Sequence, residues 1–291
     1  MKRIVILLFA LFALLASTAL ATQYPLTVRD ELGREVMLAT QPRRIVSMVP
    51  SHTETLCALG ACDSLVGVGM FSNYPAHVQS LPKMGGGLQG ADIEGIVALR
   101  PDLVLVSEYG ELADTLARAG LTVYAGTPQT YAETYQTFLL LGRLVNRESA
   151  AEALVTKVQD EVAAVEAKVA GLPRPRVYYE VDPTPYSVGP ASFIGTLIAK
   201  AGGDNIVTAD MGDFPRLDPE FIVAANPEII FAYGPDAAAL AERPGWAGID
   251  AVKNGRVIAV SSAESDIISR PGPRLAEAVR YFATVFHPDA F

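Results

Sequence analysis

The chain has 291 residues, of which 50% are hydrophobic, and its formal net charge at pH 7 is −9. This length and apolar content suffice for two hydrophobic cores, so we expect two domains. No cluster of Lys and Arg follows residue 3. Because nucleic-acid binding requires clustered positive charge, the composition argues against DNA or RNA as a partner.

The N-terminus has the features of a signal peptide. The basic pair Lys2-Arg3 precedes an apolar run from Ile4 to Leu15, and Ala19-Leu20-Ala21 is a small-x-small cleavage site. The run is shorter than the ~20 apolar residues that a membrane-spanning helix needs. The residue directly after the cleavage site is Thr22 rather than a cysteine, which argues against a lipid anchor. We therefore expect residues 1–21 to be removed and the remaining chain to be exported.

Strands and helices alternate after the cleavage site, an order typical of a parallel sheet with helices on its faces. The expected strands are 45–49, 65–68 and 122–124, and the expected helices are 51–60 and 112–119. Ser51-His52-Thr53-Glu54 fits a capping box, which predicts a helix beginning at Ser51. Residues 71–90 are expected to form a long loop.

The chain has two cysteines, Cys57 and Cys62. Export permits a disulfide, but Cys57 lies on the apolar side of a predicted helix and Cys62 just beyond its glycine stop. We expect two buried free thiols, with a disulfide as the alternative. A metal site would need more ligands than these two residues.

A repeated segment is the most distinctive feature of the chain. Residues 93–106, IEGIVALRPDLVLV, recur as residues 219–232, PEFIVAANPEIIFA, and Glu94 and Glu220 are 126 positions apart (220 minus 94). Each copy predicts a short amphipathic helix opened by an acidic residue, a proline that ends it, and a buried parallel strand. The spacing is too long for a solenoid, so the repeat indicates two lobes of related design.

Between the two copies, residues 149–170 predict one long helix. Its valines recur at intervals of three and four and form an apolar stripe, comprising Val155, Val158, Val162, Val165 and Val169. At 1.5 Å per residue the helix would be roughly 33 Å long. Pro173 and Pro175 end it, and a strand at 177–181 begins the second half. A rigid helix there would fix the separation of the two lobes.

The usual signatures of enzymes are weak. Gly85 to Gly90 matches the letters of G-x-G-x-x-G but follows no predicted strand, so we interpret it as a loop. His52 and Glu54 fall on different helix faces, and His77 and His287 are distant in sequence. We expect His52 to be a hydrogen-bonded residue of the capping turn. The sequence predicts no catalytic residue, metal site or cofactor, and a secreted metal-dependent hydrolase stays as the minority alternative.

Taken together, these segments resemble the helical-backbone class of periplasmic binding proteins, which deliver metal chelates to ABC importers. The resemblance covers essentially the whole mature chain. It is carried by the segments 43–47, 50–54, 72–75, 93–106, 149–170, 202–205 and 246–260. Within the class, Ser72-Asn73-Tyr74-Pro75 and residues 266–274 look most like the cobalamin-binding members. Other members carry ferric siderophores or haem.

The resemblance implies a ligand cleft lined by Tyr74, Tyr186, Phe214, Asp266 and Arg270. Aromatic faces would cover a flat macrocycle, while Asp266 and Arg270 would hydrogen-bond its amide fringe. Core packing of the aromatics, and a surface ion pair between Asp266 and Arg270, are the alternatives.

Glu94 and Glu220 have two interpretations. Acidic residues in a first helical turn complement the helix dipole, which gives local stabilisation. In the resembled family, matching glutamates, one in each lobe, pair with arginines of the permease. The duplication makes such a pair nearly symmetric, as docking on a two-fold transporter requires.

The resulting expectation is an α/β protein with two Rossmann-like lobes, each with a parallel sheet, joined by one rigid helix. Its parts would be a signal peptide at 1–21, an N-terminal lobe at 22–146, a connecting helix at 147–172 and a C-terminal lobe at 173–291. It would be a monomeric periplasmic receptor for a corrinoid, delivering to ABC permease subunits. A ferric-siderophore or haem receptor of the same class is the alternative.

Overall fold

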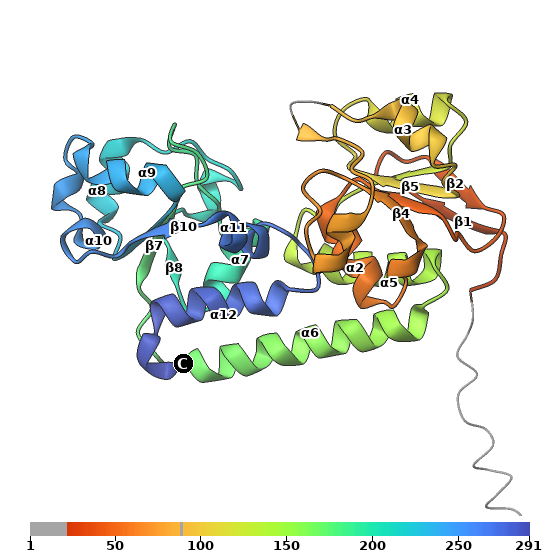
Figure 1. The fold of residues 1–291 in the computed structure, drawn as a ribbon. Helices are drawn as coiled ribbons and strands as arrows, with labels where there is room; N and C mark the ends of the chain where they lie inside the picture. Colours follow the sequence, from red (N-terminus) through yellow and green to blue (C-terminus); the bar gives the residue numbers. More distant parts are fainter. Residues whose placement is uncertain (1–21, 88–89) are drawn as a thin grey trace, which may run out of the picture.

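The computed structural model describes residues 22–87 and 90–291. The predicted signal peptide, residues 1–21, lies outside the described residues, as do Leu88 and Gln89 of the predicted loop. The described chain forms two α/β lobes, each built on a four-stranded parallel sheet, with the long helix α6 (Glu148–Val169) running beneath both (Figure 1). Within 22–87 and 90–291, none of the helices has the length and apolarity that a membrane span requires.

The sheet of the N-terminal lobe has the strand order β4-β3-β5-β6. Its strands are β3 (Ile45–Ser47), β4 (Leu65–Val68), β5 (Leu103–Val106) and β6 (Val123–Ala125). A hairpin of β1 (Leu26–Arg29) and β2 (Glu35–Leu38), absent from the sequence prediction, packs beside it. The helices of this lobe are α2 (Pro50–Ala58), α3 (Ile93–Ala98), α4 (Leu112–Arg118) and α5 (Tyr131–Leu144).

The sheet of the C-terminal lobe has the order β10-β9-β7-β8. Its strands are β7 (Arg176–Tyr179), β8 (Asp204–Asn205), β9 (Ile229–Tyr233) and β10 (Val257–Val260). Its helices are α7 (Phe193–Lys200), α8 (Pro219–Ala225), α9 (Gly234–Ala239), α10 (Asp250–Lys253), α11 (Ser262–Ile268) and α12 (Leu275–Phe286). When the strands are numbered from the start of each lobe, both sheets have the order 2-1-3-4, so the duplication extends to the topology.

The repeated segment forms the same local structure in both lobes. Asp92 caps α3 by accepting a hydrogen bond from the N–H of Gly95, and Asp218 caps α8 in the same way from Glu220. Each helix is followed by a residue with positive φ, Arg100 at 47° and Asn226 at 46°. The same left-handed turn therefore leads into the prolines and the central strands β5 and β9.

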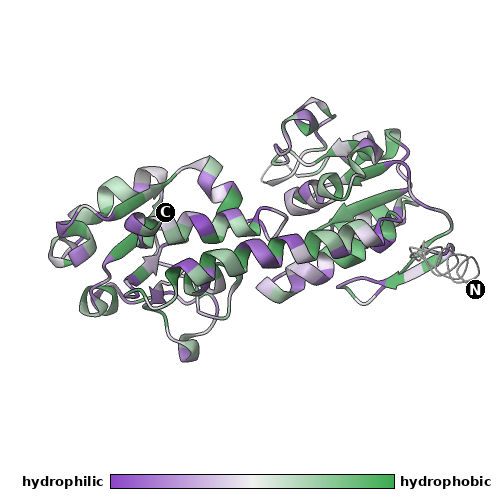
Figure 2. Cartoon of the chain, turned by 90° about the horizontal axis from the view of Figure 1, so that it is seen from below, coloured by the Kyte–Doolittle hydropathy of each residue, from purple (hydrophilic) through white to green (hydrophobic). Residues whose placement is uncertain are grey.

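Helix α6 joins the lobes through a continuous core. Its buried side chains recur every three or four residues and are Ala151, Leu154, Val158, Val162, Val165 and Val169. They pack against α5 of the first lobe and α12 of the second, and one hydrophobic cluster extends from Leu26 to Phe286. Figure 2 shows hydrophilic and hydrophobic residues interleaved along α6, as expected for a helix with one buried face.

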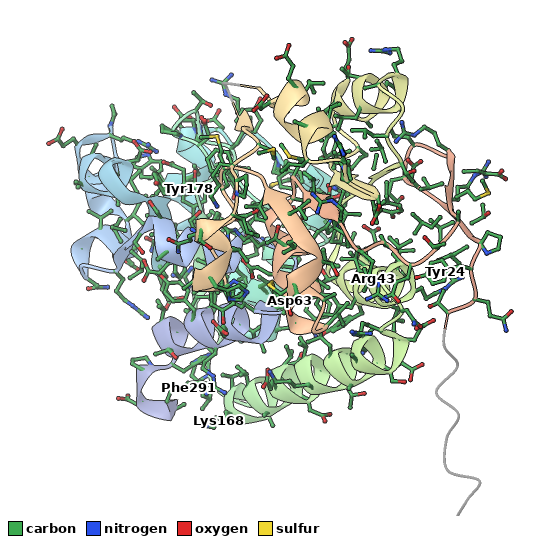
Figure 3. The ribbon with its side chains drawn as sticks, turned by 45° about the vertical axis from the view of Figure 1, so that its right-hand side comes forward. Tyr24, Arg43, Asp63, Lys168, Tyr178 and Phe291 are labelled. Atoms are coloured by element: carbon green, nitrogen blue, oxygen red, sulfur yellow. A yellow bond between two sulfur atoms is a disulfide. The ribbon has the colours of Figure 1, made fainter. Side chains whose placement is uncertain are left out.

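The C-terminus returns to the end of α6. The Nζ of Lys168, in the last turn of that helix, lies 4.9 Å from the centroid of the Phe291 ring (Figure 3). The second lobe is therefore attached to α6 by both α12 and the terminal residues. This arrangement supports the prediction of a rigid connection, since no single flexible linker joins the lobes.

Three local expectations were wrong. Helix α2 begins at Pro50 with Val49 as N-cap and no side-chain cap, so Ser51 to Glu54 is not a capping box. The ring nitrogens of His52 are buried without a hydrogen-bond partner, so this histidine is not satisfied. The predicted loop 71–90 contains a short 3-10 helix, η2 (Ala76–Ser80).

The cysteines are joined in a disulfide rather than left as free thiols. Helix α2 ends at Ala58, and Gly60, with a φ of 71°, reverses the chain so that the Cα atoms of Cys57 and Cys62 lie 4.1 Å apart. In the sequence, Gly60 suggested that Cys62 lies away from the helix. In the structure, the turn at Gly60 brings Cys62 back to the end of α2.

Candidate functional site

A cavity of about 480 Å³ lies where the two lobes meet. From the N-terminal lobe it is lined by residues that follow the carboxyl ends of the parallel strands: Val49, Pro50, Ser51, Phe71, Tyr109, Thr127, Pro128 and Gln129. From the C-terminal lobe it is lined by Asp266, Ser269, Arg270 and Pro271. Open parallel sheets bind ligands at this end, because the loops there diverge and leave a crevice.

Exposed aromatic side chains gather at the same ends of both sheets. Seven aromatic residues of the described chain are exposed, and six of them lie at or after the carboxyl end of a parallel strand. These six are Phe71, Tyr74, Tyr109, Tyr186, Phe214 and Tyr233. Exposed aromatics are costly to leave in water, so their concentration on the facing ends of two lobes indicates a surface for a large apolar or flat ligand.

The five predicted ligand-binding residues divide into two groups. Asp266 and Arg270 line the inter-lobe cavity. Tyr74, Tyr186 and Phe214 are exposed aromatics of the strand-end loops and do not line that cavity. Core packing, the alternative considered for the aromatics, is therefore wrong for these three residues, because core side chains are buried.

An ion network connects the lobes at the floor of the cleft. Glu54 of α2, whose side chain is 1% exposed, accepts hydrogen bonds from two arginines of the other lobe. Nη1 of Arg270 lies 2.9 Å from Oε1 of Glu54, and Arg274 is bidentate, with Nε and Nη2 at 2.8 and 2.7 Å from the two carboxylate oxygens. A buried carboxylate is stable only with such partners, which explains why Glu54 does not cap its own helix.

Arg270 is held on all sides. Its Nη1 also donates to Oδ1 of Asn73 at 2.8 Å, and its Nη2 donates to the carbonyl of Phe71 at 2.9 Å and to Oδ1 of Asp266 at 2.5 Å. Asn73 in turn donates to Oδ2 of Asp266 at 2.7 Å. The guanidinium is thus a structural bridge between the lobes, and its edge forms part of the cavity wall.

Tyr74 is oriented by the same network. The Cζ of Arg274 lies 4.4 Å from the centroid of the Tyr74 ring, a cation–π contact. One face of the ring is therefore covered by Arg274, while the residue stays exposed. The ion network therefore holds two parts of the cleft in place: Arg270 in the cavity wall and the Tyr74 ring at the rim.

The comparisons with known proteins agree with this architecture. The profile of the family described as periplasmic binding protein matches residues 45–263. The chain belongs to this family. Its members bind solutes for transport rather than catalyse reactions, so the hydrolase alternative is set aside, and the bound molecule is cargo rather than a cofactor.

Individual relatives cover most of this periplasmic binding protein. An uncharacterized ABC transporter substrate-binding lipoprotein, YvrC of Bacillus subtilis, is 32% identical over 280 residues, which are 92% of this chain and 87% of that protein. A cobalamin-binding protein of Halobacterium salinarum is also 32% identical, over 92% of this chain and 75% of its own length. The haem-binding protein RhuT of Roseiflexus has a similar structure, with a TM-score of 0.73, 27% identity, and coverage of 86% of this chain and 99% of RhuT.

Sequence reasoning missed several cavity residues of this binding protein. Ser51, Phe71, Tyr109 and Gln129 each follow a predicted strand or helix boundary, and their position at the carboxyl end of a strand was the available signal. It also missed Glu54 as a link between lobes, because its arginine partners lie 216 and 220 positions away.

Glu94 and Glu220 are exposed in the first turns of α3 and α8. Within the described residues neither carboxylate has an ion-pair or hydrogen-bond partner. Figure 1 shows α3 and α8 on the sides of their lobes remote from α6. Beside Glu220 lies a hollow of about 730 Å³, lined by Pro219, Val223, Ala224 and Trp246 among others. Both glutamates are therefore free to meet another molecule.

The stability of this protein is expected to depend on His52 below neutral pH. Burial lowers the pKa of His52 from 6.5 to about 4. Between these values the unfolded chain binds a proton that the folded chain does not, so acid favours unfolding. Between pH 6.5 and pH 4 the wild-type protein should therefore lose up to about 3 kcal/mol of its free energy of unfolding through His52. We expect His52→Leu to abolish this contribution. Urea titrations across the interval test it, and parallel stability curves for the two proteins would contradict it.

Proposed function

We propose that this protein captures cobalamin or a related corrinoid in the inter-lobe cleft and delivers it to an ABC importer. The observation that carries the proposal is the gathering of six exposed aromatic residues at the facing ends of the two sheets. A corrinoid presents a broad apolar macrocycle edged with amides, which suits aromatic faces and a few fixed polar groups. The 32% identity to a cobalamin-binding protein supports the same ligand.

The polar wall of the cavity suits a neutral amide fringe. Ser51 offers a hydroxyl group to the cavity. The side-chain oxygens of Gln129 and Asp266 each accept one hydrogen bond from the protein, so each keeps a lone pair that can accept from a ligand amide. Both terminal nitrogens of Arg270 donate hydrogen bonds to acceptors of the protein, so the cavity presents little free positive charge. A ligand with several carboxylates would gain less from this wall than a ligand with carboxamides.

Haem is the second candidate, favoured by the structural likeness to RhuT. Haem iron takes an axial ligand from His, Cys, Met or Tyr, and among the described cavity-lining residues Tyr109 alone is of these types. Desolvation and the nearby Glu108 carboxylate raise the pKa of Tyr109 above its ordinary value. Among the described cavity-lining residues, the haem candidate therefore depends on this one phenol.

Two substitutions of Tyr109 separate the candidates. For a stacked corrinoid we expect Tyr109→Phe to bind as wild type and Tyr109→Ala to bind about tenfold more weakly, since an aromatic contact contributes roughly 0.5 to 1.5 kcal/mol. Calorimetric titration with cyanocobalamin and with haemin measures both affinities. The corrinoid would be rejected in favour of haem by two results together. Haemin would saturate the protein while cyanocobalamin gives no heat of binding, and the spectrum of bound haemin would change in Tyr109→Phe.

Docking on the permease is the second half of the proposal. Glu94 and Glu220 would pair with basic residues of the two permease subunits, one at each lobe. Their exposure, their freedom from partners and the equivalent Asp-capped helices that carry them support this role. The apolar hollow beside Glu220 would receive a side chain of the permease next to the ion pair. The exported location follows from the expected signal peptide.

A further inference from the structure

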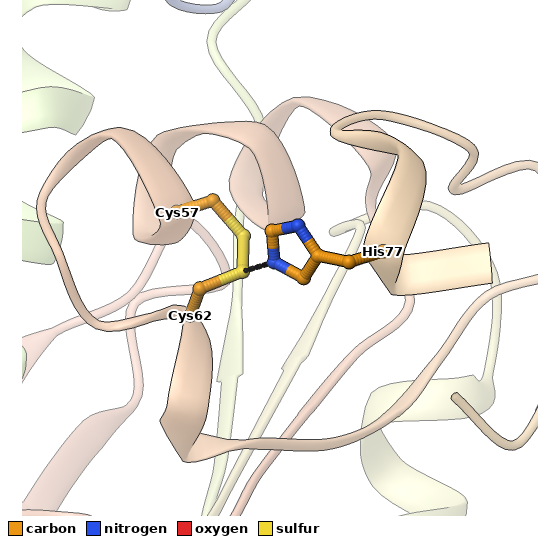
Figure 4. Close-up of side chains that lie close together, drawn as sticks. All are labelled: Cys57, Cys62 and His77. Atoms are coloured by element: carbon orange, nitrogen blue, oxygen red, sulfur yellow. Dashed lines mark hydrogen bonds between the residues drawn. A yellow bond between two sulfur atoms is a disulfide. The ribbon is translucent and has the colours of Figure 1, made fainter. Parts of the chain in front are cut away.

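A cluster of metal-ligating atoms lies outside the inter-lobe cavity. The disulfide joins the last turn of α2 to the 3-10 helix η1 (Cys62–Ser64), and His77 reaches it from η2. Nε2 of His77 lies 2.8 Å from Sγ of Cys62. Figure 4 shows the imidazole pointing at the sulfur pair from across the gap between these segments. In the sequence the two cysteines are too few to bind a metal ion. The fold brings His77 to them as a third ligand.

We propose that, when the disulfide is reduced, Cys57, Cys62 and His77 bind one thiophilic cation of the Zn²⁺ type. Reduction by a thiol or phosphine reductant adds two electrons and two protons to the S–S bond and gives two thiols. The cation then displaces both thiol protons and takes two thiolates and the neutral imidazole as ligands. A fourth position stays open to water, the pattern of a Cys₂His site.

The geometry of the cluster permits this coordination. The Sγ atoms and the imidazole nitrogen all lie within 4.8 Å of one another. In a tetrahedral zinc site, with Zn–S near 2.3 Å and Zn–N near 2.1 Å, ligand atoms are about 3.5 to 3.8 Å apart. Once the S–S bond is broken, side-chain rotations therefore suffice to reach ligand spacing. No movement of α2 or η2 is needed.

The burial of the cluster also suits an exchangeable metal. Both cysteines are partly buried and His77 is exposed. The thiolates would be shielded from water on the protein side, while the open coordination position would face solvent beside His77. The site is independent of the corrinoid proposal, because none of the three residues lines the inter-lobe cavity.

Cobalt titration of the oxidised and reduced protein tests the proposal, since Co²⁺ is a spectroscopic substitute for Zn²⁺. The purified protein is reduced with a phosphine under anaerobic conditions, and circular dichroism records its fold. We expect one Co²⁺ per chain with a sulfur-to-cobalt charge-transfer band, lost on addition of Zn²⁺. The oxidised protein should show no such band.

Variants assign the ligands. We expect His77→Ala to lower Co²⁺ affinity more than about tenfold, the least that even outer-shell changes cost at metal sites. Cys57→Ser should abolish the two-thiolate spectrum. Asp63→Asn is the matched control: Asp63 is exposed, adjoins Cys62 and lies outside the cluster, so affinity should be unchanged. Absence of the band in reduced protein, wild-type affinity in His77→Ala, or loss of fold on reduction would each overturn the proposal.

Discussion

Glu54→Ala is expected to lower the free energy of unfolding by about 3 to 5 kcal/mol, the usual effect of removing one partner of a buried ion pair. Glu54 is the common acceptor of Arg270 and Arg274, whose side chains are only 9% and 12% exposed. Its loss leaves two poorly hydrated positive charges side by side, so the penalty comes from the arginines as well as from the lost hydrogen bonds. Urea-induced unfolding measures the change.

An exposed ion pair provides the control for this variant. Lys157 and Glu161 of α6 lie 3.7 Å apart with side chains 67% and 45% exposed. Glu161→Ala should cost no more than about 1 kcal/mol, because water screens such a pair. Equal losses in Glu54→Ala and Glu161→Ala would show that the buried network contributes no special stability.

The same substitution should also weaken ligand binding. Arg270 forms part of the cavity wall, and Arg274 covers one face of Tyr74. Without Glu54, Arg274 loses the carboxylate that accepts both of its hydrogen bonds, and Arg270 loses one of its four acceptors. Glu54→Gln keeps the shape and one carbonyl acceptor, so its effects should lie between those of wild type and Glu54→Ala.

The double variant Glu94→Lys with Glu220→Lys is expected to lose most ligand uptake while its stability and ligand affinity stay near wild type. Each carboxylate is exposed in a first helical turn, where it contributes at most roughly 1 kcal/mol through the helix dipole. In a complex with basic permease residues, the same change places like charges opposite each other, which costs several kcal/mol and slows encounter. Each single variant should lose less.

Two matched assays separate docking from capture. Ligand titration of the purified variants reports capture, and transport into vesicles containing the permease reports delivery. Glu152→Lys is the control, because Glu152 is exposed on α6, away from α3 and α8 (Figure 1). Normal transport by the double variant would refute the docking role and leave only helix capping. Weakened ligand binding by the purified double variant would show that these residues act in ligand capture rather than in docking.

Much of the fold is encoded locally and could be predicted from the sequence. The repeat at 93–106 and 219–232 gave α3 with β5 and α8 with β9, because hydrophobic periodicity, acidic helix starts and prolines act over a few residues. The valine stripe predicted α6 within one residue at each end. Parallel sheets in two lobes followed from the alternation of these elements.

The tertiary structure decided which of these side chains meet. Glu54 looked like a capping residue, yet pairing with two arginines more than two hundred positions away outweighs a local cap. His77 and the cysteines converge because Gly60 turns the chain and η2 places His77 against Cys62. The group of six exposed aromatic residues at the cleft likewise depends on the ends of five strands, β4, β5, β7, β8 and β9, which belong to both lobes. Local sequence patterns predict where each helix or strand lies and which of its faces is apolar. Contacts between elements depend on the topology of the whole chain, and a local pattern carries no information about it.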